Sequence, residues 1–128
     1  MARILLIDTD ERFIETLSAK IRALGHQVDA AGTLARGLEL AGTDGCDVVF
    51  LNPVLPDGDG MDALPMLIEA PSYPEVIIVT DTGNPDQAEQ AIKMGAWDYV
   101  ERPAFTSAME LSLVRAIQYR AKKILRQP

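Results

Sequence analysis

Short apolar runs and longer amphipathic segments alternate along the chain. The apolar runs have the length and composition of buried strands. They span residues 3–7, 27–31, 47–51, 75–80 and 97–100. The longer segments have apolar residues at helical spacing, or the residues that start and stop helices. They span residues 11–24, 34–41, 61–70, 85–95 and 106–125. The chain is therefore predicted to form five strand-then-helix units.

Several residues mark where the predicted helices begin and end. Four apolar residues share one face of the first helix: Phe13, Leu17, Ile21 and Leu24. Gly25 follows them as a stop signal. Thr33 is a candidate N-cap for the second helix, which is predicted to end at Gly42. Pro65 is unfavourable inside a helix, so the 61–70 helix is predicted to start late or to bend there.

Strands that alternate with helices favour a parallel sheet covered on both faces. In such a sheet the functional crevice lies outside the carboxyl ends of the strands. Four groups of residues follow these ends: Asp8 to Asp10, Asn52 to Leu55, Thr80 to Thr82, and Glu101 to Pro103. We expect these groups to meet at one edge of the sheet.

The overall composition excludes several classes of protein. The chain has 128 residues, enough for one domain with a buried core, and no apolar run of membrane-spanning length. Its N-terminal segment lacks the features of a secretory signal. A single cysteine, Cys46, excludes an intrachain disulfide and fits a reducing cytoplasm, where we expect the protein to act. Cys46 and His26, each alone of its kind, do not make a zinc cluster or a Cys–His nucleophile.

The charge is distributed unevenly. The net charge is −7, yet residues 115–128 contain five basic residues and no acids. The acidic remainder would repel a phosphate backbone, so we do not expect this chain to bind nucleic acid directly. The basic tail is interpreted as the solvated face of the last helix. The alternative is a connector to another domain or a docking face for a partner.

Three motifs occur in order along the chain. They are LNPVLPDGDGMD (51–62), VIIVTDTG (76–83) and AIKMGAWDYVERP (91–103). Together they resemble the receiver domain of bacterial two-component response regulators. The resemblance implies a flavodoxin-like, doubly wound α/β fold with a five-stranded parallel sheet in the order 2-1-3-4-5. Residues 1–128 are then one receiver-like domain, whose last helix at 106–125 runs towards a linker and an output domain.

In that family a histidine kinase passes a phosphoryl group to an aspartate beside a Mg²⁺ held by acidic residues. The resemblance puts Asn52 at the position of this aspartate, and a carboxamide cannot form the acyl phosphate. Asp8 matches one residue of the acidic pair, Thr9 stands where the second acid is usual, and Asp10 follows. Val54 matches the residue whose carbonyl completes the metal shell. We therefore expect no metal, with Asp8 as a vestigial ligand and Mg²⁺ binding weak or lost.

Other positions of the same pocket also depart from the family pattern. Arg102 replaces the lysine that holds the phosphoryl oxygens, and Asp81 occupies a position that is usually small. Thr80 and Tyr99 match the pair that relays the change to the last helix. A planar guanidinium suits a carboxylate partner, so our hypothesis is that Arg102 pairs with Asp8 or Asp81 in place of metal and phosphate.

The expected function is regulatory and non-enzymatic, with no catalytic residues and no cofactor. The chain is interpreted as the N-terminal receiver of a transcriptional regulator that signals through protein contacts without phosphorylation. The expected partners are an output domain on the same chain or a partner protein, a histidine kinase, and a second copy bound through the last helices. Leu111, Val114 and Leu125 are the candidate exposed apolar residues for such contacts. No membrane contact is expected.

Two alternatives remain at this stage. The first is phosphorylation of a nearby carboxylate, Asp8, Asp10 or Asp81, with Mg²⁺. The second is an enzyme or flavin-binding module on the same fold. The sequence also leaves open whether the domain is locked in one conformation or switched by a ligand.

Overall fold

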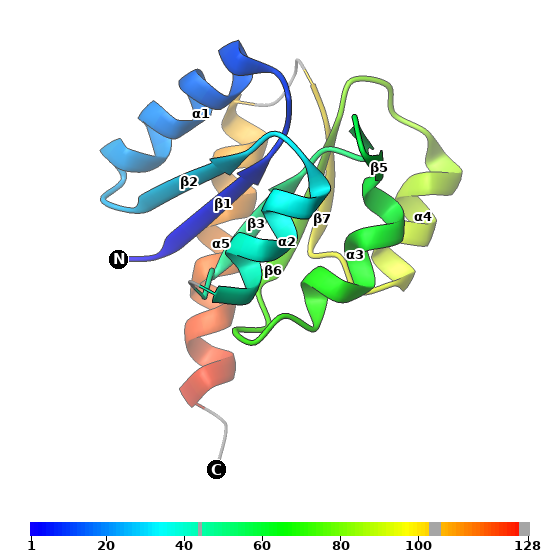
Figure 1. Cartoon of the computed structure of the whole chain (residues 1–128). Coiled ribbons are helices and arrows are strands. Elements are labelled where there is room, and N and C mark those ends of the chain that lie inside the picture. Colours follow the sequence, from blue (N-terminus) through cyan, green and yellow to red (C-terminus); the bar gives the residue numbers. More distant parts are fainter. Residues whose placement is uncertain (44, 103–105, 126–128) are drawn as a thin grey trace.

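The computed structural model describes residues 1–43, 45–102 and 106–125. A five-stranded parallel sheet runs through its centre (Figure 1). Its strands are β1 (Arg3–Ile7), β2 (Gln27–Ala31), β3 (Val48–Leu51), β6 (Glu75–Thr80) and β7 (Asp98–Glu101). They lie in the order β2-β1-β3-β6-β7, so the predicted fold and strand order are confirmed.

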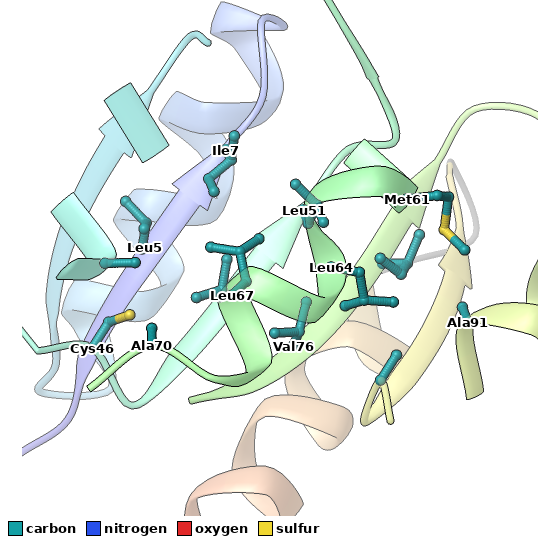
Figure 2. Packing of buried hydrophobic residues seen from close by; sticks show 14 of the residues in the cluster. Leu5, Ile7, Cys46, Leu51, Met61, Leu64, Leu67, Ala70, Val76 and Ala91 are labelled. Atoms are coloured by element: carbon teal, nitrogen blue, oxygen red, sulfur yellow. The ribbon is translucent and has the colours of Figure 1, made fainter. Parts of the chain in front are cut away.

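Helices cover both faces of the sheet (Figure 1). They are α1 (Glu11–Ala23), α2 (Leu34–Thr43), α3 (Gly60–Ile68), α4 (Pro85–Lys93) and α5 (Thr106–Leu125). Side chains alternate along each strand, so Leu5 and Ile7 face α2 and α3 while Ile4 and Leu6 face α1 and α5. Figure 2 shows the first of these two cores, in which Leu64 and Leu67 of α3 pack over the strands.

The predicted helix ends are largely confirmed, with two corrections. Thr33 Oγ1 accepts from the Arg36 N–H at 3.1 Å and caps α2, which continues through Gly42 to Thr43. Leu24 does not share the buried face of α1, because the helix ends at Ala23 and Leu24 is 41% exposed.

Two alternatives were predicted for the 61–70 helix, a late start or a bend at Pro65, and the late start is wrong. Asp59 Oδ1 accepts from the Met61 N–H at 2.8 Å, and this cap starts α3 at Gly60. The helix then continues past Pro65 to Ile68. The sequence also did not predict the small antiparallel hairpin before α3, formed by β4 (Val54–Leu55) and β5 (Gly58–Asp59).

The basic tail is not simply a solvated helix face. Arg120 is buried, and its guanidinium bonds to Asp47 Oδ1 at 2.9 Å and to the carbonyl oxygens of Ser72 and Tyr73. Lys123 Nζ lies 2.6 Å from Glu75 Oε1. These contacts fasten the second half of α5 to the loops at the amino end of the sheet, so that interpretation is wrong for Arg120 and Lys123.

Cys46 lies inside the protein, next to the same loops. Burial raises the pKa of its thiol to about 11, so the thiol stays protonated at neutral pH. Among the described residues, no helix combines the length and apolar character that crossing a membrane requires.

Candidate functional site

The carboxyl ends of β1, β3, β6 and β7 bring four polar side chains to one edge of the sheet. They are Asp8, Asn52, Thr80 and Arg102, and all four are buried. The parallel register sets this arrangement, since Ile7 pairs with Leu51, and Leu51 pairs with Ile78. The predicted meeting of these strand ends is confirmed for Asp8, Asn52 and Arg102 by direct contacts. Pro103 lies outside the described residues.

Asn52 is held by hydrogen bonds from both ends of its amide. Its Oδ1 accepts from the Val54 N–H at 2.9 Å, and its Nδ2 donates to Asp8 Oδ1 at 3.3 Å. The two partners fix which way the amide points, because Val54 needs an acceptor and the Asp8 carboxylate needs a donor. Asn52 therefore presents a neutral donor to the carboxylate beside it.

The turn after Asn52 requires a glycine at position 60. A Cβ on Gly60 would lie 2.7 Å from the Asn52 carbonyl oxygen and 2.9 Å from the Pro53 Cα. The Gly60 N–H also donates to the Pro53 carbonyl at 2.7 Å. This close backbone approach folds the 52–60 loop back over the start of α3.

Arg102 lies among the carboxylates of Asp8, Asp10 and Asp81 and forms an ion-pair cluster with them. Its Nη1 donates to Asp8 Oδ2 at 3.2 Å, and its Nε lies 3.0 Å from Asp81 Oδ1. Nε has no hydrogen-bond partner within the described residues, so its approach to Asp81 is an ion pair whose N–H is poorly aligned. The hypothesis that Arg102 pairs with Asp8 or Asp81 is confirmed, and it pairs with both.

Two further contacts hold the guanidinium of Arg102. Its Cζ lies 4.4 Å from the centroid of the Phe13 ring on α1, which is within the range of a cation–π contact. Asp10 Oδ2 lies 3.7 Å from Nη1, while Asp10 Oδ1 caps α1 through the Phe13 N–H at 3.1 Å. One cation thus faces three carboxylates, of which Asp8 is 2% exposed and the Asp81 side chain 73% exposed.

The chain is similar to known proteins over most of its length. The family model for the response regulator receiver domain matches residues 4–124. The chain belongs to this family.

Individual relatives agree with this assignment. The receiver is 32% identical over 123 residues to the probable transcriptional regulatory protein SilR of Salmonella typhimurium, covering 96% of this chain and 54% of that protein. The chain spans about half the length of the curated relatives it matches.

Solved structures are similar along nearly the whole chain. The beryllofluoride-activated NtrC4 receiver domain dimer is 30% identical with a TM-score of 0.87, covering 94% of this chain and 99% of that one. A response regulator of Burkholderia pseudomallei, solved with a phosphorylated aspartic acid and a calcium ion, is 25% identical with a TM-score of 0.82. That likeness covers 100% of this chain and 76% of the other.

The remaining predicted positions of the receiver lie around the pocket without entering the ion-pair cluster. Thr9 is exposed, and the Val54 side chain is 75% exposed. Thr80 is buried, and its Oγ1 lies 3.4 Å from both the nitrogen and the carbonyl oxygen of Thr82. Tyr99 is half-buried and donates its hydroxyl to Gln87 Oε1 at 2.8 Å. Thr80 and Tyr99 are thus bonded to the loop and helix that follow β6.

Asp57, in the β4–β5 hairpin, has a role that sequence reasoning missed. Its two carboxylate oxygens accept from the Leu34 and Ala35 N–H groups at 2.8 and 3.0 Å, so the hairpin caps the start of α2. The bonds from Ala35 and Leu34 lower the pKa of the Asp57 carboxyl. An aspartate in a Pro-Asp-Gly turn signals the turn but not a partner more than twenty residues away.

Proposed function

We propose that this receiver is a regulatory domain that signals without phosphorylation, through contacts with other proteins. The observation that carries the proposal is the buried pairing of Arg102 with Asp8, beside an Asn52 that donates to the same carboxylate. A conventional receiver pocket needs a nucleophilic carboxylate and bare oxygen ligands for a metal. In this chain Asn52 offers a carboxamide in place of the nucleophilic carboxylate. The two oxygens of Asp8 are bonded to Asn52 and Arg102, so they are not bare metal ligands.

Asn52 is unsuited to accept a phosphoryl group. A carboxamide oxygen is neutral and weakly nucleophilic, and Asn52 Oδ1 already accepts from the Val54 N–H. Asp81 adds negative charge beside the pocket, where an anionic phosphodonor would approach. Transfer to residue 52 is therefore disfavoured both by the chemistry of the acceptor and by electrostatics.

The residues present do not fit a Mg²⁺ ion. Magnesium requires near-octahedral oxygen ligands, whereas Asp8 faces the guanidinium of Arg102 on one oxygen and the amide nitrogen of Asn52 on the other. Asp8, Asp10 and Asp81 surround the guanidinium, but within residues 1–43, 45–102 and 106–125 no three histidine, cysteine or carboxylate side chains lie close enough to one another to hold a metal. The guanidinium supplies the positive charge that an ion would otherwise bring.

The proposed partners follow from the family and from exposed apolar side chains. The relatives include transcriptional regulators about twice as long as this chain, so we propose an output domain on the same chain or on a partner, in the cytoplasm, and input from a histidine kinase or another protein. Leu111 on α5 and Ile92 on α4 are half exposed and are candidates for a homodimer contact. Val114 is only partly exposed, and the side chain of Leu125 lies outside the described residues.

Membership of the receiver family favours this regulatory role over a flavin-binding module.

Phosphotransfer tests the proposal. The chain is incubated with Mg²⁺ and a small-molecule phosphodonor, and intact mass is measured, with a conventional receiver as the positive control for the reagent. We expect the mass to stay unchanged. A stoichiometric phosphoryl adduct would overturn the proposal, and its mapping to Asp8, Asp10 or Asp81 would establish the alternative of unconventional phosphorylation.

A further inference from the structure

The loop between β6 and α4 runs beside the carboxyl end of β7. Thr80 at the end of β6 pairs with Glu101 of β7, and the Arg102 N–H donates to the Thr80 carbonyl at 2.8 Å. The loop of residues 81–84 therefore begins beside the end of β7. Tyr99, Glu101 and Arg102 are all within reach of this loop.

Side chains accept from three consecutive backbone N–H groups of the loop. The Thr82 N–H points to Thr80 Oγ1 at 3.4 Å, and the Gly83 N–H donates to Glu101 Oε1 at 2.9 Å. The Asn84 N–H donates to Tyr99 Oη at 3.3 Å. Exposed loop amides can be satisfied by water, so three acceptors from the protein itself are a specific arrangement.

The same contacts reach the start of α4. Asn84 Oδ1 caps the helix by accepting from the Asp86 and Gln87 N–H groups at 2.9 and 3.2 Å. The Tyr99 hydroxyl accepts from the Asn84 N–H and donates to Gln87 Oε1, so it joins the loop to the first turn of the helix. At the other end of the loop, Asp81 is ion-paired with Arg102.

We propose that Tyr99, Glu101 and Arg102 form a latch that holds the β6–α4 loop and the first turn of α4 in one position without a bound anion. The latch rests on the proposed function, because side chains at the end of β7 would keep the β6–α4 loop ordered in a receiver that is not phosphorylated. It holds the loop at three points, Asp81, Gly83 and Asn84, through three side chains of one strand end. It also occupies the Gly83 and Asn84 N–H groups, which are then not free to bind an anion.

Substitution of Gly83 should disturb the latch without disturbing the rest of the fold. A Cβ at this position would overlap Oε2 of Glu101 and lie 2.7 Å from its Cδ, whereas the Gly83 backbone is not in the left-handed region. Because the carboxylate is the free end of a flexible side chain, Gly83→Ala should displace Glu101 while the fold persists. Gly32→Ala is the matched control, since a Cβ at Gly32 meets nothing within 4 Å.

The test is amide hydrogen exchange of residues 83 and 84, measured by NMR on the 128-residue chain and corrected for intrinsic rates. We expect both amides to be protected in the wild type. Gly83→Ala and Glu101→Ala should each speed exchange at residue 83 by about tenfold, the effect of losing one hydrogen bond to a charged group. Glu101→Gln, which keeps an acceptor, and Gly32→Ala should stay near the wild type.

Two outcomes would overturn the latch: wild-type amides that exchange at the unprotected rate, or Glu101→Ala indistinguishable from the wild type at residue 83. Glu101→Ala decides the matter even if Gly83→Ala does not fold. The intact-mass experiment separates this inference from the proposed function. An unphosphorylated chain with an unprotected loop refutes only the latch, and a phosphorylated chain with a protected loop refutes the proposed function.

Discussion

Arg102 Nη1 and Asp8 Oδ2 lie 3.2 Å apart, although the two residues are 94 positions apart in the sequence and follow strands with β3 and β6 between them. Arg102 is 8% exposed and Asp8 2%, so the Asp8 carboxylate depends on Arg102 for its neutralisation, whereas Arg102 also faces Asp10 and Asp81. A buried ion pair gives little net stability relative to a well-packed apolar pair, but the loss of one partner is costly. We therefore expect the loss of Arg102 alone to destabilise the fold.

Replacing Arg102 by methionine should destabilise the fold strongly. The variant keeps much of the side-chain volume but leaves the Asp8 carboxylate buried without its cation, which typically costs about 3–5 kcal/mol. Urea unfolding measures the change, with Arg115→Met, an exposed site on α5, as the control. A loss below about 1 kcal/mol, as for an ordinary surface pair, would mean that the Arg102–Asp8 pair is not what neutralises the pocket.

Arg120→Ala should also destabilise the protein, by about 3 kcal/mol, because it removes a partner from Asp47 and from two backbone carbonyl groups. Lys122→Ala, two residues further along the same helix and exposed, should change the free energy of unfolding by less than about 0.5 kcal/mol. Thermal and urea unfolding of both variants provide the comparison. Equal effects would show that α5 is not fastened through Arg120.

Asp57 should make the stability of the folded protein depend on pH in the acid range. Its folded-state pKa lies below the ordinary value of 3.8, so its stabilising contribution is complete above that value and is lost as the pH falls through the folded-state pKa. Asp57→Asn should therefore lower the melting temperature at neutral pH, and the difference from the wild type should shrink in strong acid. Asp29→Asn, an exposed carboxyl on β2, serves as the control. A constant difference at all pH values would contradict the capping role of the Asp57 carboxylate.

Alanine substitutions at Gly60 and Gly42 should differ in their effect on the free energy of unfolding. At Gly60 an added Cβ would press on the backbone of Asn52 and Pro53, which cannot rotate away, so Gly60→Ala should cost about 1–3 kcal/mol. At Gly42, within α2, nothing lies within 4 Å of the added Cβ, so Gly42→Ala should leave stability unchanged or raise it by up to about 1 kcal/mol. Unfolding free energies of the pair decide the matter. Similar values for both would show that the 52–60 loop tolerates a side chain at position 60.

The sequence predicts the sheet and the ion-pair cluster for the same physical reason. Strands buried on both faces appear as continuous apolar runs, and their parallel arrangement brings the residues that follow them to one edge. The pairing of Arg102 with Asp8 and Asp81 follows once these strand ends are expected to meet. A guanidinium placed among carboxylates has few other partners.

Other contacts could not be predicted because they join segments without a local pattern. Arg120 bonds to loop atoms 47 to 73 positions away. It continues the buried face of α5 four residues after Ala116, but its charged side chain favours a solvated position when the sequence alone is considered. The β4–β5 hairpin has two residues per strand, too few for an alternating pattern. The bond between Glu101 and Gly83 depends on strand register, which the order of the elements alone does not fix.

The sharpest test of Arg102 as the replacement for a metal is a Mg²⁺ titration followed through the backbone amide signals of Asp8, Asp10 and Asn52. The double variant Asn52→Asp, Arg102→Met restores a carboxylate and removes the guanidinium, and it should show saturable shifts at these positions. In the wild-type chain we expect the three signals to stay unchanged throughout the titration. Saturable shifts in the wild type would show that Arg102 has not displaced the metal and would contradict the proposed basis for phosphorylation-independent signalling.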